Sequence, residues 1–252
     1  MLKRSIYLVM IVVILFVASC GPKVKPVDLG QSHYKMAQSY IAAKDYTDAL
    51  DEMLQAVKYK PNDADFQSTL AMVYFEKKAY VLSETHYKKS LQLRPNDPTV
   101  QHNFAALYLS MQRWDDAAEL FRQVADNLLF RYQTRALIGL GVAHYHGGHR
   151  MKAVMAFKEA INTDSRNTNA LFLLSKTYYS MAKYDLARQY LKQTLLLVPD
   201  SIDAHLLLGE SLLQLEENEA AAIEFREVAN RADRTEKGQK AREYLQLLDG
   251  EM

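Results

Sequence analysis

Small and apolar residues recur along this chain at a fixed interval of 34 residues, and the pattern is clearest in residues 64–97. There, Leu70, Ala71 and Tyr74 form one apolar set, and a second set begins at Ser83. Side chains of the same size return 34 residues earlier and later, while the polar positions between them change. Because apolar residues three or four apart lie on one face of a helix, each stretch predicts two amphipathic helices.

Two small positions recur in six copies of this pattern once two extra residues between the third and fourth copies are allowed. In the first predicted helix the small residues are Ala37, Ala71, Ala105, Gly141, Ser175 and Gly209. In the second helix they are Ala49, Ser83, Ala117, Ala153, Ala187 and Ala221. Small side chains let two helices approach closely, so each copy is expected to fold as a helical hairpin.

A helical hairpin repeated every 34 residues resembles the tetratricopeptide repeat. The resemblance implies an all-α fold, a right-handed α-solenoid of six such repeats. The expected copies are residues 30–63, 64–97, 98–131, 134–167, 168–201 and 202–235. Residues 236–252 predict a C-terminal capping helix of the kind that terminal repeats require. Its apolar face would hold Ala241, Tyr244, Leu245 and Leu248, with Lys237, Lys240, Arg242 and Glu243 pointing outward.

Residues 1–19 have the features of an export signal rather than of a folded element. Lys3 and Arg4 precede an apolar run from Ile6 to Val17. This run, at about 12 residues, is shorter than the roughly 20 that a membrane-spanning helix needs. We therefore expect a signal peptide, which is removed from the mature protein.

The end of this signal, residues 17–20, resembles the bacterial lipobox, in which the cysteine is acylated and becomes the mature N-terminus. The resemblance implies a covalent lipid at Cys20, with residues 20–29 as a short lipidated tether; an ordinary cleaved signal is the alternative. Cys20 is the single cysteine of the chain, so an intramolecular disulfide is excluded. By the same resemblance, Gly21 in place of aspartate favours the outer membrane of a cell with two membranes.

The charge of the chain is almost balanced, with 31 Lys and Arg against 30 Asp and Glu. Removal of residues 1–19 takes away two cations and leaves the balance close to neutral. A general nucleic-acid-binding protein would carry a basic excess on one face. We therefore expect no nucleic-acid partner, and attachment to a membrane only through the acyl chains.

The residues most suggestive of site chemistry are three histidines, His144, His146 and His149. A metal site is disfavoured because no acidic or cysteine ligand is near them in sequence. The acidic pairs at 115–116 and 216–217 are expected to favour the positive ends of helix dipoles. No nucleophile motif, phosphate loop or dinucleotide fingerprint is present, so we expect no enzyme, no metal, no cofactor beyond the lipid, and no small-molecule substrate.

The inner wall of such a stack is lined by the first helices, at about the second, fifth, ninth and twelfth positions of each copy. These positions hold Tyr34, Gln38, Ile41, Met72, Phe75, His102, Leu109, Ile138, Val142, Tyr145, Phe172, Tyr179 and Leu206. So many apolar and aromatic residues predict a protein-binding groove. For any one of them, burial against a neighbouring first helix is the alternative. Repeat proteins that capture carboxylate tails carry Lys and Asn where the first copy here has Tyr34 and Gln38, so tail capture is disfavoured.

The lipobox, tether and six repeats together resemble the type IV pilus biogenesis and stability lipoproteins, the pilotins of the pilus secretin. Residues 84–95 are similar to that family's second-copy ending, and residues 103–109 to its third-copy start. The insertion at 126–136, with Tyr132 and Thr134, resembles a family segment. Two departures are Asn127, where proline is usual, and a single asparagine before residue 104.

This resemblance implies a non-enzymatic, periplasm-facing outer-membrane lipoprotein. Its partner would be the pilus secretin, whose subunits it would bring to the outer membrane and help to assemble into the multimeric pore. The alternative is a repeat lipoprotein that serves outer-membrane protein assembly or complexes of cell-wall enzymes.

Overall fold

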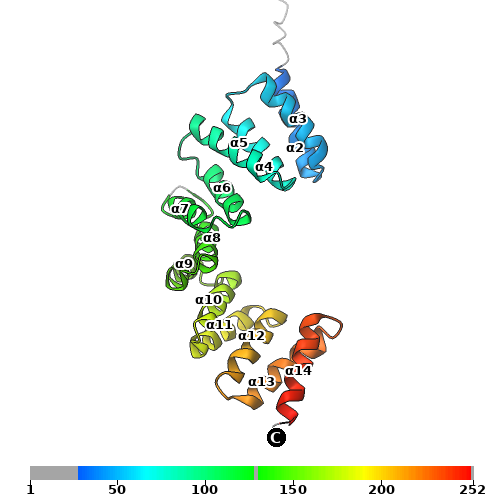
Figure 1. Ribbon diagram of the computed structural model, residues 1–252, viewed down its shortest axis with the longest axis vertical. Coiled ribbons are helices and arrows are strands. Elements are labelled where there is room, and N and C mark those ends of the chain that lie inside the picture. The colour runs from blue at the N-terminus through cyan, green and yellow to red at the C-terminus, as the bar shows by residue number, and fades with distance from the viewer. Residues whose placement is uncertain (1–27, 128–129, 251–252) are drawn as a thin grey trace, which may run out of the picture. The chain divides into compact units, whose positions relative to one another are not determined.

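The computed structural model describes residues 28–127 and 130–250, and every regular element in these ranges is an α-helix (Figure 1). The chain divides into two compact units, residues 1–60 and residues 61–252, which are described separately below. Within the described ranges, no helix is both long enough and apolar enough to cross a membrane. The predicted signal, the lipidation site at Cys20 and most of the predicted tether lie outside the described residues.

The described part of the first unit is one helical hairpin, formed by α2 (Leu29–Ala42) and α3 (Tyr46–Tyr59). The side chain of Asp28 caps α2 by accepting a hydrogen bond from the backbone N–H of Gln31 at 3.1 Å. Residues 28 and 29 were expected in the tether, but the cap and the first turn place them in the folded hairpin. Ala37 on α2 and Ala49 on α3 are fully buried.

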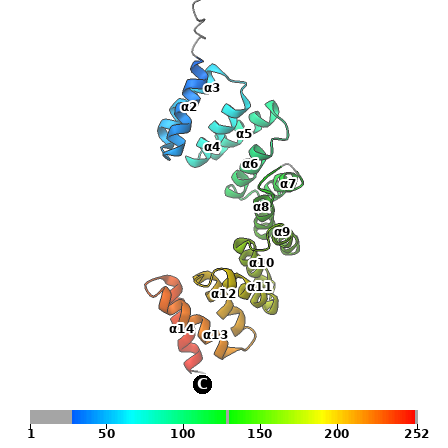
Figure 2. The ribbon, with the colours of Figure 1, turned by 180° about the vertical axis from the view of Figure 1, so that it is seen from behind.

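The described residues of the second unit form five further hairpins and a final single helix. Its helices are α4 (Ala64–Glu76), α5 (Tyr80–Leu93), α6 (Pro98–Ser110), α7 (Trp114–Ala125), α8 (Gln133–His146), α9 (Arg150–Thr163), α10 (Thr168–Ser180), α11 (Tyr184–Leu197), α12 (Ile202–Leu213), α13 (Asn218–Arg231) and α14 (Glu236–Gly250). Each helix packs on the next, as both views show (Figures 1 and 2). The first helices also contact one another in series, from α4 to α6 and onward to α14. This arrangement confirms the predicted all-α solenoid.

All twelve small positions identified in the sequence are buried in the structure. The close approach that they permit is visible in the hairpin of α4 and α5, where the hydroxyl of Ser83 donates a hydrogen bond to the carbonyl oxygen of Ala71 at 2.7 Å. A larger side chain at either residue would push the two backbones apart. The periodicity of small residues therefore reports the crossing points of the helices.

Where the small residue is glycine, a phenylalanine of the second helix occupies the space of the missing side chain. A Cβ added to Gly141 would lie 2.4 Å from Phe157, and one added to Gly209 would lie 2.6 Å from Phe225. The same contact also occurs between copies. A Cβ added to Gly139 on α8 would lie 2.5 Å from Phe121 on α7, which belongs to the preceding hairpin.

The turn inside every hairpin has one residue in the left-handed conformation, at the fifteenth position of each copy. These residues are Lys44, Lys78, Gln112, Gly148, Ala182 and Glu216. In the fifth copy the N–H of Ala182 binds the carbonyl of Tyr179 at 2.9 Å, and the next N–H binds the carbonyl of Tyr178 at 3.0 Å. The other five turns have the same pair of hydrogen bonds, which satisfy carbonyl groups left free at the helix end.

These turns predict opposite effects for two substitutions that interchange alanine and glycine. Replacing Gly148 by alanine should lower the free energy of unfolding by about 1 kcal/mol, because a Cβ is strained at positive φ. Replacing Ala182 by glycine should raise it by a smaller amount, since strain is relieved at an entropic cost. Urea unfolding of both variants checks this. No atom lies close enough to Gly148 for an added Cβ to clash, so backbone strain alone would account for the loss of stability. Effects of the same sign in the two variants would contradict the prediction.

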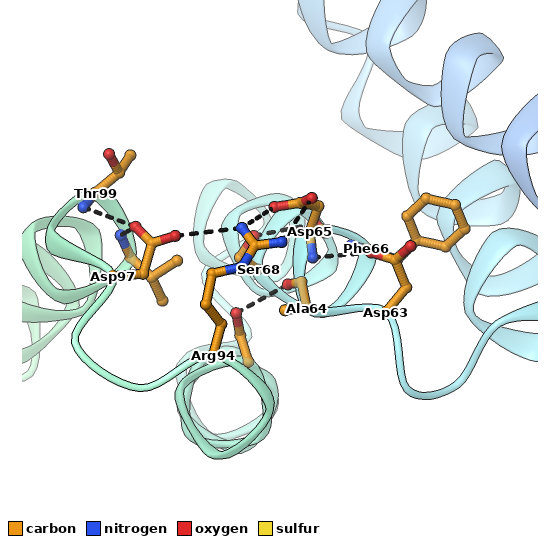
Figure 3. A network of polar contacts seen from close by, with 10 residues as sticks. Asp63, Ala64, Asp65, Phe66, Ser68, Arg94, Asp97 and Thr99 are labelled. Carbon is orange, nitrogen blue, oxygen red and sulfur yellow. Dashed lines mark hydrogen bonds and ion pairs between the residues drawn. The ribbon is translucent and has the colours of Figure 1, made fainter.

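The connection between the second and third copies is held by charged side chains (Figure 3). Two nitrogens of the Arg94 guanidinium bind the two carboxylate oxygens of Asp65, at 2.7 and 3.0 Å. A longer contact of 3.4 Å joins Arg94 to Asp97. Asp97 in turn caps α6 by accepting from the backbone N–H groups of Thr99 and Val100. Arg94 therefore links the start of one hairpin to the start of the next.

Candidate functional site

The three predicted groove residues of the first unit lie on α2. Tyr34 and Ile41 are half-buried, and Gln38 is exposed. The ten predicted residues of the second unit are all half-buried. They are Met72 and Phe75 on α4, His102 and Leu109 on α6, Ile138, Val142 and Tyr145 on α8, Phe172 and Tyr179 on α10, and Leu206 on α12.

Apart from His102, these ten side chains pack against the hydrophobic core with part of their surface. Each therefore combines a packing role with a surface open to solvent. His102 is held mainly by packing, because its ring centroid lies 5.5 Å from that of Phe121 and 5.8 Å from that of Phe130. Burial lowers the pKa of His102, which favours the neutral imidazole.

Four predicted residues converge in the C-terminal half of the second unit, around one lysine that the prediction did not include. A small cavity of about 30 Å³ is lined by Val142 and Tyr145 together with His146, Phe157, Leu173 and Lys176. An open depression of about 430 Å³ is lined by Phe172 and Leu206 together with Lys176, Asp203, Leu207, Glu210 and Lys240. Because Lys176 lines both, the two form one continuous surface, here named the C-terminal groove.

Ion pairs between α12 and α14 neutralise most of the charge in this groove. Lys240 lies 2.6 Å from Glu210, and Lys237 lies 2.6 Å from Asp203. The hydroxyl of Tyr244 donates a further hydrogen bond to Glu210 at 3.4 Å. The hydrogen bond to Glu210 raises the pKa of Lys240, and burial raises that of Tyr244. Lys237 and Lys240 were predicted to point outward, and in the structure both also bind carboxylates of α12.

Lys176 differs from the other lysines of the groove because no carboxylate in the described part of the chain lies within ion-pair distance of it. Its side chain is exposed, and its ammonium group lies 5.8 Å from the centroid of the Tyr145 ring. That ring also contacts the guanidinium of Arg150, whose Cζ lies 4.1 Å from the centroid. The Tyr145 ring on α8 therefore interacts with two cationic side chains, those of Lys176 on α10 and Arg150 on α9.

The charged residues of this groove were missed because the sequence prediction, apart from Gln38, kept only apolar and aromatic side chains. Lys176 and Glu210 occupy the ninth position of their copies, and Asp203 occupies the second, so the same positional rule includes them. Lys240 and Tyr244 come from the capping helix, to which the rule was not applied. Charged residues at the second and ninth positions of each copy would therefore have identified Lys176, Asp203 and Glu210 from the sequence.

The three histidines have different surroundings in the structure. The Nδ1 atom of His144 is buried without a hydrogen-bond partner, and burial lowers the pKa of this residue. His146 stacks on Trp114 at 5.1 Å, and His149 lies 3.6 Å from Asp115. That acidic neighbour comes from the preceding copy and could not be found by proximity in sequence. Among residues 28–127 and 130–250, no group of three or more His, Cys, Asp or Glu could hold a metal ion.

The acidic pairs at helix starts serve partly to connect the copies. Asp115 and Asp116 lie in the first turn of α7, as expected for residues that favour the positive end of the helix. Glu217 is the N-cap residue of α13, but its side chain makes no capping hydrogen bond with the backbone of that helix. Its carboxylate instead binds the guanidinium of Arg188 on α11. Glu217 therefore stands at the positive end of α13, as expected, and also joins this helix to α11.

Comparison with known families agrees with the helical geometry. The profile of the tetratricopeptide repeat family matches residues 34–98 and 102–170, which is more than half of the chain. The chain belongs to the tetratricopeptide repeat family. Proteins of this family are in general non-catalytic scaffolds that bind other proteins. A second profile, that of anaphase-promoting complex, cyclosome, subunit 3, matches residues 147–228. No curated protein matches the sequence significantly.

Several solved structures have the same fold. One is PilW, described as a widely conserved type IV pilus biogenesis factor, with a TM-score of 0.75 and 17% identity. The similarity covers 84% of this chain and 98% of PilW. Another is pilF of Pseudomonas aeruginosa, with a TM-score of 0.70, 16% identity and coverage of 84% and 96%. YrrB, a repeat protein with an unusual peptide-binding site, has a TM-score of 0.62, 15% identity and coverage of 76% and 97%. At these identities the likeness shows a shared fold.

Proposed function

We propose that this protein is a non-enzymatic lipoprotein of the outer membrane that binds subunits of a type IV pilus secretin and promotes their assembly into the multimeric pore. The observation that carries the proposal is the extent of the likeness to PilW, which includes nearly all of that structure. The lipobox-like residues 17–20 add independent support, because an anchored secretin-binding protein is what the pilotin resemblance implies.

The anchor gives this role a physical basis. Acyl chains at Cys20 would hold the protein at the membrane in which the pore must insert, since each buried methylene contributes about 0.8 kcal/mol. A bound secretin subunit would then be confined near the same surface. Confinement raises the effective concentration of subunits and so favours their association without any new contact between them.

The repeats supply the binding surface. Tyr145, Phe172 and Leu206 expose part of their side chains in the C-terminal groove. Aromatic residues such as Tyr145 and Phe172 are enriched in protein interfaces. The described charged residues of the groove are mostly paired with one another, so binding would depend chiefly on apolar contacts.

The decisive experiment is deletion of the gene, followed by measurement of heat-resistant secretin multimers in the outer-membrane fraction. We expect the multimers to be lost and monomeric secretin to accumulate, with recovery when the wild-type gene is returned. Unchanged multimers, accompanied by loss of other outer-membrane proteins or of cell-wall enzyme complexes, would favour the alternative scaffold role.

Replacing Cys20 by serine should release the protein from the membrane fraction and leave its helicity unchanged. The acyl chains are the proposed anchor, and the first described helix begins only at Leu29. Fractionation and circular dichroism check the two parts of this prediction. If the variant still sediments with the outer membrane to the wild-type extent, the protein is not anchored through this cysteine.

A further inference from the structure

We propose that the C-terminal groove selects a partner segment in which an acidic side chain lies beside a large apolar one, and that Lys176 binds this carboxylate. The inference rests on the proposed function only in taking the groove as a protein-binding surface. It adds the chemistry of the segment that the groove accepts.

The charge of the groove supports an acidic residue in the partner. Two carboxylates of α12, those of Asp203 and Glu210, are each paired with a lysine of α14 at 2.6 Å. Lys176 is left as the one lining cation without a carboxylate among the residues that the structure describes. An anionic group placed at Lys176 would therefore complete the pairing of charges in the groove.

The surroundings of Lys176 support apolar residues next to that acid. On one side lie Val142, Tyr145 and Leu173, which line the small cavity. On the other side lie Phe172 and Leu206, which line the larger depression. In an extended segment, side chains two residues apart lie on the same face, so an acidic residue at Lys176 would place apolar neighbours over both sets.

The position of Lys176 favours an acidic side chain over a chain terminus. The lysine lies where the cavity and the depression meet, so space continues on both sides of it for a chain that passes through. A terminal carboxylate would instead end the chain in the middle of the groove and leave half of the apolar surface uncovered. Nucleic acid is disfavoured because a phosphate backbone is bound by several cations, and the described lysines near the groove other than Lys176 are paired with Asp203 and Glu210.

Selection from a library of random 12-residue peptides displayed on phage provides a test that requires no known partner. The baits are the wild-type chain, Lys176→Gln, and Lys192→Gln as a matched control. Lys192 on α11 is exposed and, like Lys176, forms no ion pair with any described carboxylate. We expect wild type and Lys192→Gln to enrich sequences with Asp or Glu two residues away from Leu, Ile or Phe, and Lys176→Gln to enrich apolar sequences without the acid.

The affinity of one enriched peptide then measures the contribution of the ion pair between Lys176 and the acidic residue of the peptide. Changing its acid to the amide should weaken binding to wild type by about twofold to fivefold, the range for an exposed ion pair. The same change should have no effect on binding to Lys176→Gln, and a peptide with lysine in place of the acid should bind Lys176→Glu better than wild type does. Circular dichroism establishes that each variant is folded.

Several results would overturn the inference. These are failure of the wild-type chain to enrich any peptide, enrichment of peptides without an acid, enrichment of peptides whose acid is always the terminal carboxylate, and an acid-to-amide effect that persists in Lys176→Gln. Failure of the proposed function is recognised separately, because it appears as unchanged secretin multimers in the deletion strain. Acid-dependent peptide binding through Lys176 in that case would leave this inference standing and assign the groove to a different partner.

Discussion

Replacing Ala187 by tryptophan is expected to lower the free energy of unfolding by about 3 kcal/mol. Ala187 is fully buried on α11, and Ser175, the small residue of the other helix in that hairpin, is fully buried on α10. Leu174 and Leu191 are also inaccessible to solvent, so no space remains for an indole ring. The hairpin would have to separate, and its contacts with both neighbouring hairpins would weaken.

Urea unfolding followed by circular dichroism measures this effect. The control is Gln189→Trp, which adds the same ring to an exposed position of the same helix and should change stability by less than about 0.5 kcal/mol. Because neighbouring repeats stabilise one another mainly across their shared interfaces, a shallower transition for Ala187→Trp would indicate that the fifth hairpin unfolds ahead of the rest. An unchanged midpoint and slope would show that Ala187 does not lie at a close helix crossing.

The second large effect is expected on binding of the secretin subunit. Replacing Tyr145 or Phe172 by alanine should weaken that binding about thirtyfold, since loss of a central aromatic anchor costs about 2 kcal/mol. Both side chains line the C-terminal groove while part of their surface packs on the core. The measurement is the affinity of each variant for purified secretin subunits, together with multimer yield in cells.

The matched control is Leu186→Ala, which removes an exposed apolar side chain from α11, outside the lining of the groove. It should bind secretin as wild type does, and all three variants should keep wild-type helicity. If Tyr145→Ala and Phe172→Ala bind and assemble normally while Lys152→Glu abolishes both activities, secretin binds the surface formed by the second helices.

Much of the fold could be predicted because small residues mark places where two backbones meet, and such places tolerate little variation. Ala37 and Ala117 illustrate this, since both are fully buried at the expected positions. The left-handed residue in each turn could not be predicted in the same way. Lys44, Gln112 and Glu216 carry no preference for positive φ, and only Gly148 indicates it. The hairpin geometry imposes this conformation on whichever residue is present.

The candidate site was predicted only in part. Periodicity placed Tyr145 and Phe172 on the correct helices, but it could not show that Lys176 has no described acidic partner, because ion pairing depends on the relative placement of three helices. The pair formed by Glu210 and Lys240 joins a repeat to the capping helix, across a boundary where the period of the sequence no longer applies. Similarly, Asp115 contacts His149 only because successive turns are stacked.

The contacts between glycine and phenylalanine have a consequence for how such arrays can be recombined. Gly141 with Phe157, and Gly209 with Phe225, are matched pairs within one hairpin, so moving a whole hairpin keeps both partners together. Exchanging only the first helix between the second and fourth copies would place Ala71 against Phe157, where the structure has room only for a hydrogen atom. Phe121 of the third hairpin and Gly139 of the fourth form a matched pair of the same kind. The third and fourth hairpins would therefore have to be moved together.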